Sequence, residues 1–276
     1  MTSFIHENFT IRIVVFLTGI QILISSLECL YGCRIYRNGQ LLSWKFIKQS
    51  RKIFKGSGLL PQVVDFLFEY PRVLLLFALR AGLDLYLLWL VIIDANGQVV
   101  VATILLVTLL GVLLTWRNTY SNNGADQLAN IILISVCIST LEGEGSVIKV
   151  LSLIFIACQS QLSYLTSGFF KLLEKDWRSG VNLRGVFSTQ VFGHPVLKRM
   201  MDKWAPSYRV MSFFIIYGEL AMGCAMFFPP KICLIMLCIG MLFHFMTAVV
   251  MGLNAFLWTF VATYPAIYFL CLRIHA

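Results

Sequence analysis

Long apolar runs separated by short polar segments follow one another along most of this chain. Windows of about nineteen residues pick out the runs 11–32, 73–93, 98–116, 127–141, 147–170, 209–228, 232–252 and 254–272. Most of them approach the roughly 20 residues that an α-helix needs to cross a hydrocarbon core about 30 Å thick. The pattern therefore predicts an all-α fold, a polytopic integral membrane bundle with about eight spans.

The number of spans depends on one short run, and the number of domains depends on two long connections. The run 127–141 is short for a full crossing, so it is less tilted than its neighbours, re-entrant, or extended by flanking polar residues. Seven spans is therefore the alternative count. The two long connections, roughly 33–72 and 171–208, are each too small to hold a domain with its own core. We expect a single transmembrane domain over residues 1–276.

The first long connection contains the segment "FIKQSRKIFKGSGLLPQVVDFLFEY". Apolar residues alternate there with Lys and Arg as they do on a helix that lies in the membrane interface. The apolar positions are Phe46, Ile47, Ile53 and Phe54. We expect an amphipathic interfacial helix that ends at the Gly-Ser-Gly of 56–58.

Composition supports a membrane protein. Hydrophobic residues make up 59% of the chain and the mean hydropathy is +0.82, more than soluble domains carry. The net charge of +9 comes from cations between the runs, without the aromatic and basic platform that holds nucleic acid bases. We therefore expect membrane lipid as a partner and no nucleic acid. The first ten residues, "MTSFIHENFT", contain no Lys or Arg, so we expect the first span to be retained.

The distribution of cations also predicts an orientation. The two long connections carry most of the Lys and Arg residues, which places these loops in the cytoplasm by the positive-inside rule. With eight spans, both termini then lie outside. Most of the eight cysteines lie inside apolar runs as packing residues, and Cys29 and Cys33 are not at metal-ligand spacing, so we expect no metal site.

Charged residues inside the runs need partners, because an ionised side chain at mid-membrane costs roughly 2.5 to 3.5 kcal/mol. Arg80 and Asp84 are four residues apart, and we expect them to pair on one helix face. Glu219 has no cation three or four residues away, so its partner must come from another helix. It is either a neutral hydrogen-bonded side chain or one that moves a proton. His244 is either a packing histidine or a catalytic one.

The segment "SYLTSGFFKLLEKDWRSG" places Lys171 at the end of an apolar run. Ser167 and Gly168 allow another helix to approach closely. Phe169 and Phe170 would lower the dielectric around the amine, which depresses a lysine pKa and makes the amine a base. The alternative is that the side chain snorkels to the lipid headgroups.

A second polar segment, "WRNTYSNNGADQLAN", joins two runs. Asn122, Asn123 and Gly124 are typical of a turn, and Asp126 is favoured near a helix N-terminus by the helix dipole. The amides and hydroxyls of this segment suit either helix capping or a polar pocket.

These segments resemble the HTTM (horizontally transferred transmembrane) superfamily, which includes vitamin K-dependent gamma-carboxylase. The resemblance covers nearly the whole chain and rests on "RNTYSNNGADQL", on "YLTSGFFKLLEKDWRSG" and on the late block that ends "MGLNAFLWTFVATYP". It implies that Lys171 matches the lysine taken as the base that deprotonates vitamin K hydroquinone, and hence a quinol as cofactor. The candidate catalytic residues are Lys171, Glu219 and His244. The candidate cofactor-binding residues are Asn118, Tyr120, Asp126, Tyr164 and Trp177.

The chain departs from the carboxylase in three ways. An extra residue separates Lys171 from Trp177, no histidine matches the one near "WRN", and a large extramembrane part is absent. The size is more similar to bacterial membrane proteins that mature a sporulation-delaying peptide toxin. This resemblance implies a multi-pass protein of the bacterial plasma membrane whose partners are a secreted precursor peptide and a small companion protein.

Two other functions stay open. One is a quinol-dependent, carboxylase-like membrane enzyme that uses Lys171 as base. The other is a transporter or immunity protein, which the ionisable Glu219 and His244 inside the runs would suit. In the carboxylase the loop after the lysine faces the non-cytoplasmic side, opposite to the orientation that the cations predict.

Overall fold

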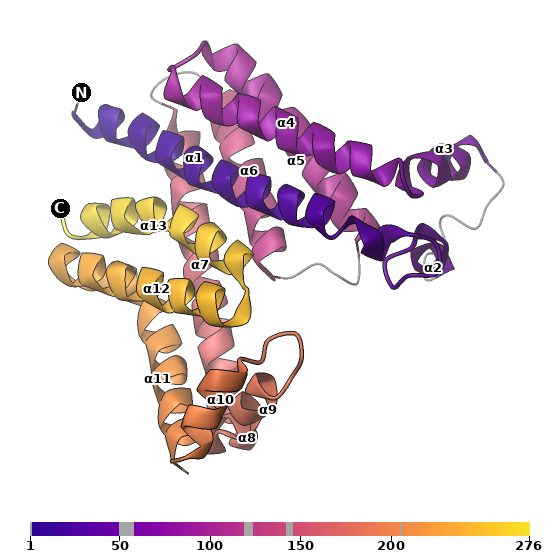
Figure 1. Cartoon of the computed structure of the whole chain (residues 1–276). Coiled ribbons are helices and arrows are strands. Elements are labelled where there is room, and N and C mark those ends of the chain that lie inside the picture. Colours follow the sequence, from indigo (N-terminus) through magenta and orange to yellow (C-terminus); the bar gives the residue numbers. More distant parts are fainter. Residues whose placement is uncertain (1, 50–57, 119–123, 142–145, 205) are drawn as a thin grey trace. The chain divides into compact units, whose positions relative to one another are not determined.

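The computed structural model describes residues 2–49, 58–118, 124–141, 146–204 and 206–276 (Figure 1). These residues form helices and no strand, so the predicted all-α fold is confirmed. The chain divides into two compact units. One comprises Met1–Val14 with Lys149–Ala276, and the other comprises Val15–Ile148. A single domain over residues 1–276 stays a prediction.

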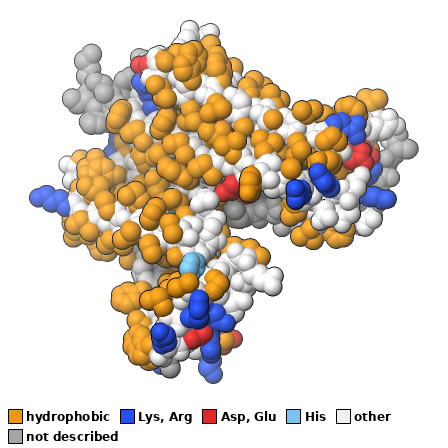
Figure 2. All heavy atoms as spheres, in the orientation of Figure 1, with side chains coloured by type: hydrophobic (Ala, Val, Ile, Leu, Met, Phe, Trp, Pro, Cys, Tyr) orange, Lys and Arg blue, Asp and Glu red, His pale blue; other side chains and the backbone are white. Residues whose placement is uncertain are grey.

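Seven helices in the described part of the chain are long and apolar enough to cross a membrane. They are α1 (Thr2–Tyr31, with Glu7–Tyr31 as its apolar stretch), α4 (Val73–Ile92), α5 (Gly97–Arg117), α6 (Gly124–Leu141), α7 (Val147–Leu173), α12 (Pro230–Met251) and α13 (Asn254–Ile274). Hydrophobic side chains cover the long helices that face the viewer in Figure 2. The chain is a multi-pass membrane protein.

The count of eight spans is wrong, and the alternative of seven matches the structure. The run 209–228 forms α11 (Ser207–Met222), whose 16 residues extend about 24 Å, less than the hydrocarbon thickness. Beyond Gly223 the chain turns into the short 3-10 helix η3 (Ala225–Phe227). The run 127–141 is short, but the helix also includes the preceding residues 124–126. The resulting helix, α6, therefore has 18 residues.

The C-terminal end of α11 lies beside Gln161, near the middle of α7. With its amide nitrogen turned toward the Gly223 carbonyl and its oxygen toward the Met226 N–H, Gln161 makes hydrogen bonds of 3.1 and 3.0 Å. Gln161 is buried. The last carbonyl groups of a helix have no partner within the helix, so a neighbouring side chain can satisfy them. Gln161 therefore stabilises the break between α11 and α12.

The unit that contains α11 also holds three short helices. They are α8 (Lys175–Ser179), α9 (Val181–Phe187) and α10 (Pro195–Asp202). A small core joins them to α11: it consists of Leu183 and Phe187 from α9, Met201 from α10 and Tyr208 from α11, and Trp177 of α8 packs against it. After α11, the helices α12 and α13 pair as a hairpin. The short helices thus form a compact cap at the start of α11.

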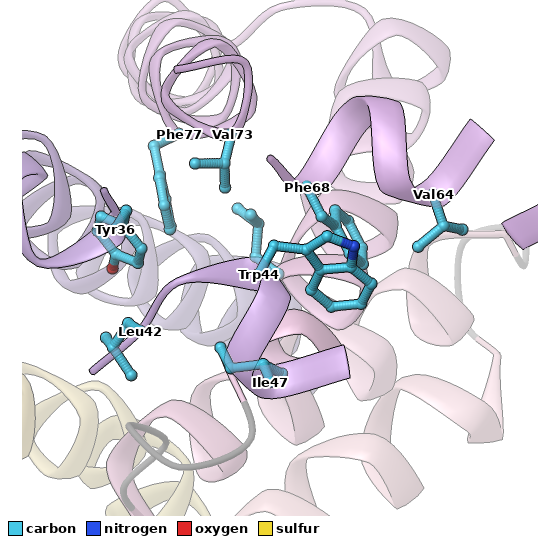
Figure 3. Packing of buried hydrophobic residues seen from close by; sticks show 9 residues of the cluster. Tyr36, Leu42, Trp44, Ile47, Val64, Phe68, Val73 and Phe77 are labelled. Atoms are coloured by element: carbon cyan, nitrogen blue, oxygen red, sulfur yellow. The ribbon is translucent and has the colours of Figure 1, made fainter. Parts of the chain in front are cut away.

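In the unit Val15–Ile148, α5 packs between α4 and α6. The connection before α4 contains η1 (Cys33–Tyr36), α2 (Trp44–Gln49) and α3 (Leu59–Phe68). These elements meet around a buried cluster of Tyr36, Leu42, Trp44, Ile47, Val64, Phe68, Val73, Phe77 and Leu114 (Figure 3).

The prediction that 46–54 forms a helix on the membrane surface is partly wrong, because Ile47 belongs to this buried cluster. Phe46 is 53% exposed, as expected of a residue on a membrane surface, but Ile47 is fully buried. Ile47 packs into the protein because α3 and α4 cover that face of α2. Ile53, Phe54 and the predicted stop at 56–57 lie outside the described residues.

Arg117 fixes the end of α5 to this connection. Its guanidinium is fully buried and donates to the carbonyl oxygens of Leu42 (2.9 Å) and Phe68 (3.4 Å). It also donates to Oδ1 of Asn118 (2.9 Å) and lies 4.7 Å from the ring centroid of Tyr36. The hydrogen bonds of its two terminal nitrogens offset much of the cost of burying the charge, although Nε has no partner among the described residues. Arg117 therefore holds the connection in one arrangement.

The expected pairing of Arg80 with Asp84 is not formed. Both side chains are buried, yet neither carboxylate oxygen of Asp84 has a hydrogen-bond partner among the described residues. The two side chains diverge: Nη2 of Arg80 lies near Gly111 of α5, and Oδ1 of Asp84 lies near Gly19 of α1. Spacing along the helix places both groups on one face, and their charges still act on each other, but they form no direct hydrogen bond.

Asp65 joins α3 to α2 outside the spans. Its Oδ1 accepts from Nε1 of Trp44 (2.7 Å), and its Oδ2 accepts from Nζ of Lys48. Burial acts to raise the pKa of Asp65, but the hydrogen bonds from Lys48 and Trp44 outweigh it, so the pKa is lowered. The folded state therefore binds this proton less tightly than the unfolded chain does.

We expect Asp65→Asn to lower the thermal stability of the detergent-solubilised protein at neutral pH. A lowered carboxyl pKa stabilises the fold above the unfolded-state value, which is 3.8 here, and this stabilisation is lost as the pH falls through the folded-state pKa. The difference in Tm between wild type and variant should thus shrink below about pH 4. The control is Glu69→Gln, whose more exposed carboxylate pairs with Arg72. A Tm difference that is the same at every pH would contradict this role.

Candidate functional site

A buried ion pair links α7 to α11. Nζ of Lys171, in the last turn of α7, lies 2.7 Å from both carboxylate oxygens of Glu219. The helices approach closely because Gly168 has no side chain: a Cβ there would lie 2.9 Å from Cγ and 3.1 Å from the backbone nitrogen of Leu220. The partner from another helix that the sequence requires for Glu219 is therefore Lys171.

The surroundings of the ammonium differ from expectation. The side chains of Lys171 and Glu219 are only 17% and 11% exposed. Lys171 also donates to the hydroxyl of Ser167 and lies 5.4 Å from the ring centroid of Trp177. Phe169 and Phe170 are more than half exposed, so they do not enclose the amine as predicted. The ammonium is held by Glu219 and Ser167, whereas a snorkelling lysine would direct it to water and headgroups.

A cavity of about 760 Å³ lies beside this pair. Nearly all of its lining is apolar, supplied mainly by α11 and by Ile239, Gly240 and Phe243 of α12. Glu219 of α11 and Tyr164 of α7 also belong to the lining, and because almost none of the lining is polar, they contribute mainly apolar atoms to it. Lys171 is not among the described lining residues. The Lys171–Glu219 pair therefore lies next to the cavity, and Glu219 is the member of the pair that belongs to its lining. The volume suits a small organic ligand.

Tyr164 belongs to a buried hydrogen-bonded chain that crosses three helices. Its Oη lies 2.6 Å from Nε2 of His244 on α12 and 3.0 Å from Oη of Tyr264 on α13. All three groups are satisfied when Tyr264 donates to Tyr164 and Tyr164 donates to an unprotonated Nε2 of His244. One turn away along α7, the hydroxyls of Ser160 and Thr263 are 2.8 Å apart. These contacts fix the orientation of Tyr164 at the cavity wall.

His244 reaches the cavity only through Tyr164. Its side chain is 5% exposed and stacks on Phe260, with ring centroids 4.6 Å apart and an interplanar angle of 12°. This environment agrees with the packing interpretation of His244 in that its imidazole is buried and hydrogen-bonded. It also makes His244 a positioning residue for the Tyr164 hydroxyl.

The structure brings together five of the eight predicted site residues in one unit: Lys171, Glu219, Tyr164, His244 and Trp177. The remaining three belong to the unit Val15–Ile148. Asn118 is buried and accepts from Arg117, and Asp126 lies in the first turn of α6, as the helix dipole predicts. Tyr120 lies outside the described residues.

Sequence reasoning missed two members of the site. Ser167 was assigned only to close helix packing, yet it accepts from Lys171. Tyr264 was part of the quoted "VATYP" block but was given no role. A tyrosine in an apolar run needs a partner for its hydroxyl, and this was the available signal.

Comparison of the chain with protein-family models, with curated proteins and with solved structures finds no match. The resemblance to the HTTM superfamily thus stays a prediction.

We expect the Lys171–Glu219 pair to behave as a unit in stability measurements. Glu219→Gln leaves the Lys171 ammonium without its carboxylate, and Lys171→Met leaves a carboxyl group that must bind a proton. Each single variant should cost about 3 kcal/mol, whereas the double variant should lose much less than the sum of the two. Unfolding of the purified protein in detergent measures these differences. Lys203→Met, at an exposed position, serves as control. Additive losses in the double variant would show that the two side chains do not interact.

The hydrogen-bonded chain of His244, Tyr164 and Tyr264 predicts different stability losses when different hydroxyls are removed. Tyr164→Phe removes the central hydroxyl and leaves Nε2 of His244 without its donor, so it should cost about 2 kcal/mol, whereas Tyr264→Phe removes only the terminal hydroxyl and should cost about 1 kcal/mol. The same unfolding assay measures both, with Tyr217→Phe at an exposed position as control. Equal losses for Tyr164→Phe and Tyr217→Phe would contradict the hydrogen-bonded chain.

Proposed function

We propose that this protein is a membrane-embedded enzyme whose Lys171–Glu219 pair exchanges a proton with a lipophilic substrate of quinol type. The observation that carries the proposal is the position of this buried ion pair at the wall of an apolar cavity of about 760 Å³. An apolar pocket with one charged group and one oriented hydroxyl is a common form of small-molecule site. A quinol has a flat apolar ring, often an apolar tail, and a hydroxyl proton to lose.

We assign the proton-accepting role to Glu219, and the ion pair supports this choice. A protonated lysine has no free lone pair, whereas an ionised carboxylate has several. The quinol O–H bond breaks, its electron pair stays on the quinol oxygen, and the proton binds a carboxylate oxygen of Glu219. Lys171 then stabilises the quinolate anion by its charge. The resemblance implies the other order, in which Lys171 first gives its proton to Glu219 and then acts as the base.

The other residues of the site have supporting roles. The Tyr164 hydroxyl is fixed by His244 and Tyr264, so it can orient a polar group of the substrate at the wall of the cavity. Trp177 and Ser167 hold the ammonium of Lys171 in place. No part of this step requires a residue of the unit Val15–Ile148.

The biological setting that we propose is maturation of a secreted peptide toxin, at the bacterial plasma membrane, together with a small companion protein. The similarity in size and motifs to bacterial toxin-maturation proteins supports this setting. Transport or immunity is the competing class. It predicts that cells expressing this chain alone acquire ion-coupled uptake or resistance to the toxin.

The test is the intact and fragmented mass of the secreted peptide from cells that carry wild type, Lys171→Met, Glu219→Gln or Lys203→Met. We expect the mature mass with wild type and Lys203→Met, and the precursor mass with the two site variants, when all four proteins reach the membrane at equal levels. Loss of a positioned acid–base group lowers a rate by about a hundredfold or more. Identical peptide masses from all four strains would exclude covalent chemistry at the pair. If the mature peptide is lost with Lys171→Met but is still made with Glu219→Gln, Lys171 is favoured as the base.

A further inference from the structure

A second hollow, of different chemistry, lies at the start of α11. It has a volume of about 570 Å³ and lies where the end of α7, α8 and the beginning of α11 meet. Cations, a hydroxyl and aromatic rings share its lining: Lys175, Arg178, Arg209, Ser179, Phe213 and Tyr217. Neither member of the Lys171–Glu219 pair is among these residues. The hollow is therefore distinct from the ion pair, although Phe213 and Tyr217 also line the 760 Å³ cavity.

Within the described residues, no carboxylate forms an ion pair with the cations of this hollow, although Glu174 and Asp176 flank Lys175 in the sequence. Within the described part of the chain, Lys175, Arg178 and Arg209 form no ion pair, whereas the nearby Arg184 is 3.3 Å from Asp202. All three side chains are exposed. Three like charges in one hollow repel one another, and an anion bound between them removes that repulsion.

Backbone packing holds these cations together. Gly180, which follows α8, has φ +85, a conformation that favours glycine. A Cβ at this position would lie 2.6 Å from the backbone nitrogen of Arg209 and 2.6 Å from the carbonyl carbon of Tyr208. The end of α8 therefore lies directly against the first turn of α11. This contact brings Arg178 and Arg209 into one hollow although they are far apart in sequence. In Figure 2, Lys and Arg side chains gather around α8–α10.

The hollow continues into an apolar surface along α11. Arg209, Phe213 and Tyr217 are spaced four residues apart, so they share one helix face. The Arg209 guanidinium lies 5.9 Å from the Phe213 ring centroid, and the Phe213 and Tyr217 rings stack with centroids 5.9 Å apart. Both rings also line the 760 Å³ cavity. A positive site thus passes directly into an aromatic and apolar one, as at a membrane interface.

We propose that this hollow binds the phosphate headgroup of an anionic membrane phospholipid, with the acyl chains lying along Phe213 and Tyr217. Arg178, Arg209 and Lys175 neutralise the phosphate, and the Ser179 hydroxyl can donate to one of its oxygens. A lipid fits better than a soluble anion because Phe214 and Tyr217 on α11 are 76% and 55% exposed and need an apolar cover. The proposal does not depend on the proposed catalytic function.

The test is native mass spectrometry of the delipidated, detergent-solubilised full-length protein, titrated with phosphatidylglycerol or with phosphatidylcholine. We expect tighter binding of phosphatidylglycerol by wild type. Arg178→Gln and Arg209→Gln should each weaken it about fivefold, the effect of one cation at a membrane surface. Arg178→Lys should retain most of the binding. Lys203→Gln, at an exposed cation outside the hollow, should bind as wild type does.

Three results would overturn the proposal. Equal binding of the two lipids by wild type would remove the need for an anionic headgroup. Equal weakening by Lys203→Gln and Arg178→Gln would reduce the effect to overall charge. Displacement of phosphatidylglycerol by an equal concentration of inorganic phosphate would identify a site for free phosphate instead of lipid. Because the readout is binding and not turnover, failure here leaves the proposed acid–base function untouched.

Discussion

An ammonium and a carboxylate that are both removed from water must neutralise each other, and this constraint governs the unit that holds the site. Separately, Lys171 and Glu219 would each be costly to bury, and together they form one of the few charged contacts that a membrane protein can keep inside. Their contact requires α11 to lie close against α7, which Gly168 permits. The same approach places Glu219 at the cavity wall, so packing and proposed chemistry depend on one interaction.

A second constraint follows from the hydrocarbon itself. A helix that ends inside the membrane leaves backbone donors and acceptors without water, and α11 ends beside the middle of α7. Gln161 supplies the missing partners for Gly223 and Met226. Interrupted helices of this kind are where membrane proteins often place binding sites. The cavity next to α11, with Tyr164 fixed by His244 and Tyr264, is consistent with that use.

The sequence predicts much of the fold because apolar run length is a direct physical requirement of the membrane. The seven longest helices follow the runs closely. The run 209–228 was predicted as a full span, but its helix α11 ends at Met222, before Gly223 and the 3-10 helix η3, and is therefore too short. Charged partners were harder to predict. Glu219 was expected to need a partner from another helix, but spacing could not show that it is Lys171. Arg80 and Asp84 had the right spacing and still diverge toward different neighbours.

Contacts that form only where three helices meet cannot be predicted from a local sequence pattern. The Tyr164 hydroxyl touches residues 80 and 100 positions away, and no periodicity relates them. In the polar segment after α5, local composition did suggest a candidate site residue, but the structure gives that residue another role. Asn118 accepts a hydrogen bond from Arg117, which has a packing role.

The most direct test of the central claim is infrared difference spectroscopy of the full-length protein in lipid nanodiscs at neutral pH, comparing wild type with Glu219→Gln and with Lys171→Met. If the buried pair is charged, Glu219→Gln removes an ionised carboxylate band from the spectrum. Lys171→Met then converts that band to one of a protonated carboxyl group, because the unpaired carboxylate is too costly to keep ionised. A protonated carboxyl band assigned to Glu219 in the wild type would contradict the ion pair and, with it, the role of Glu219 as proton acceptor.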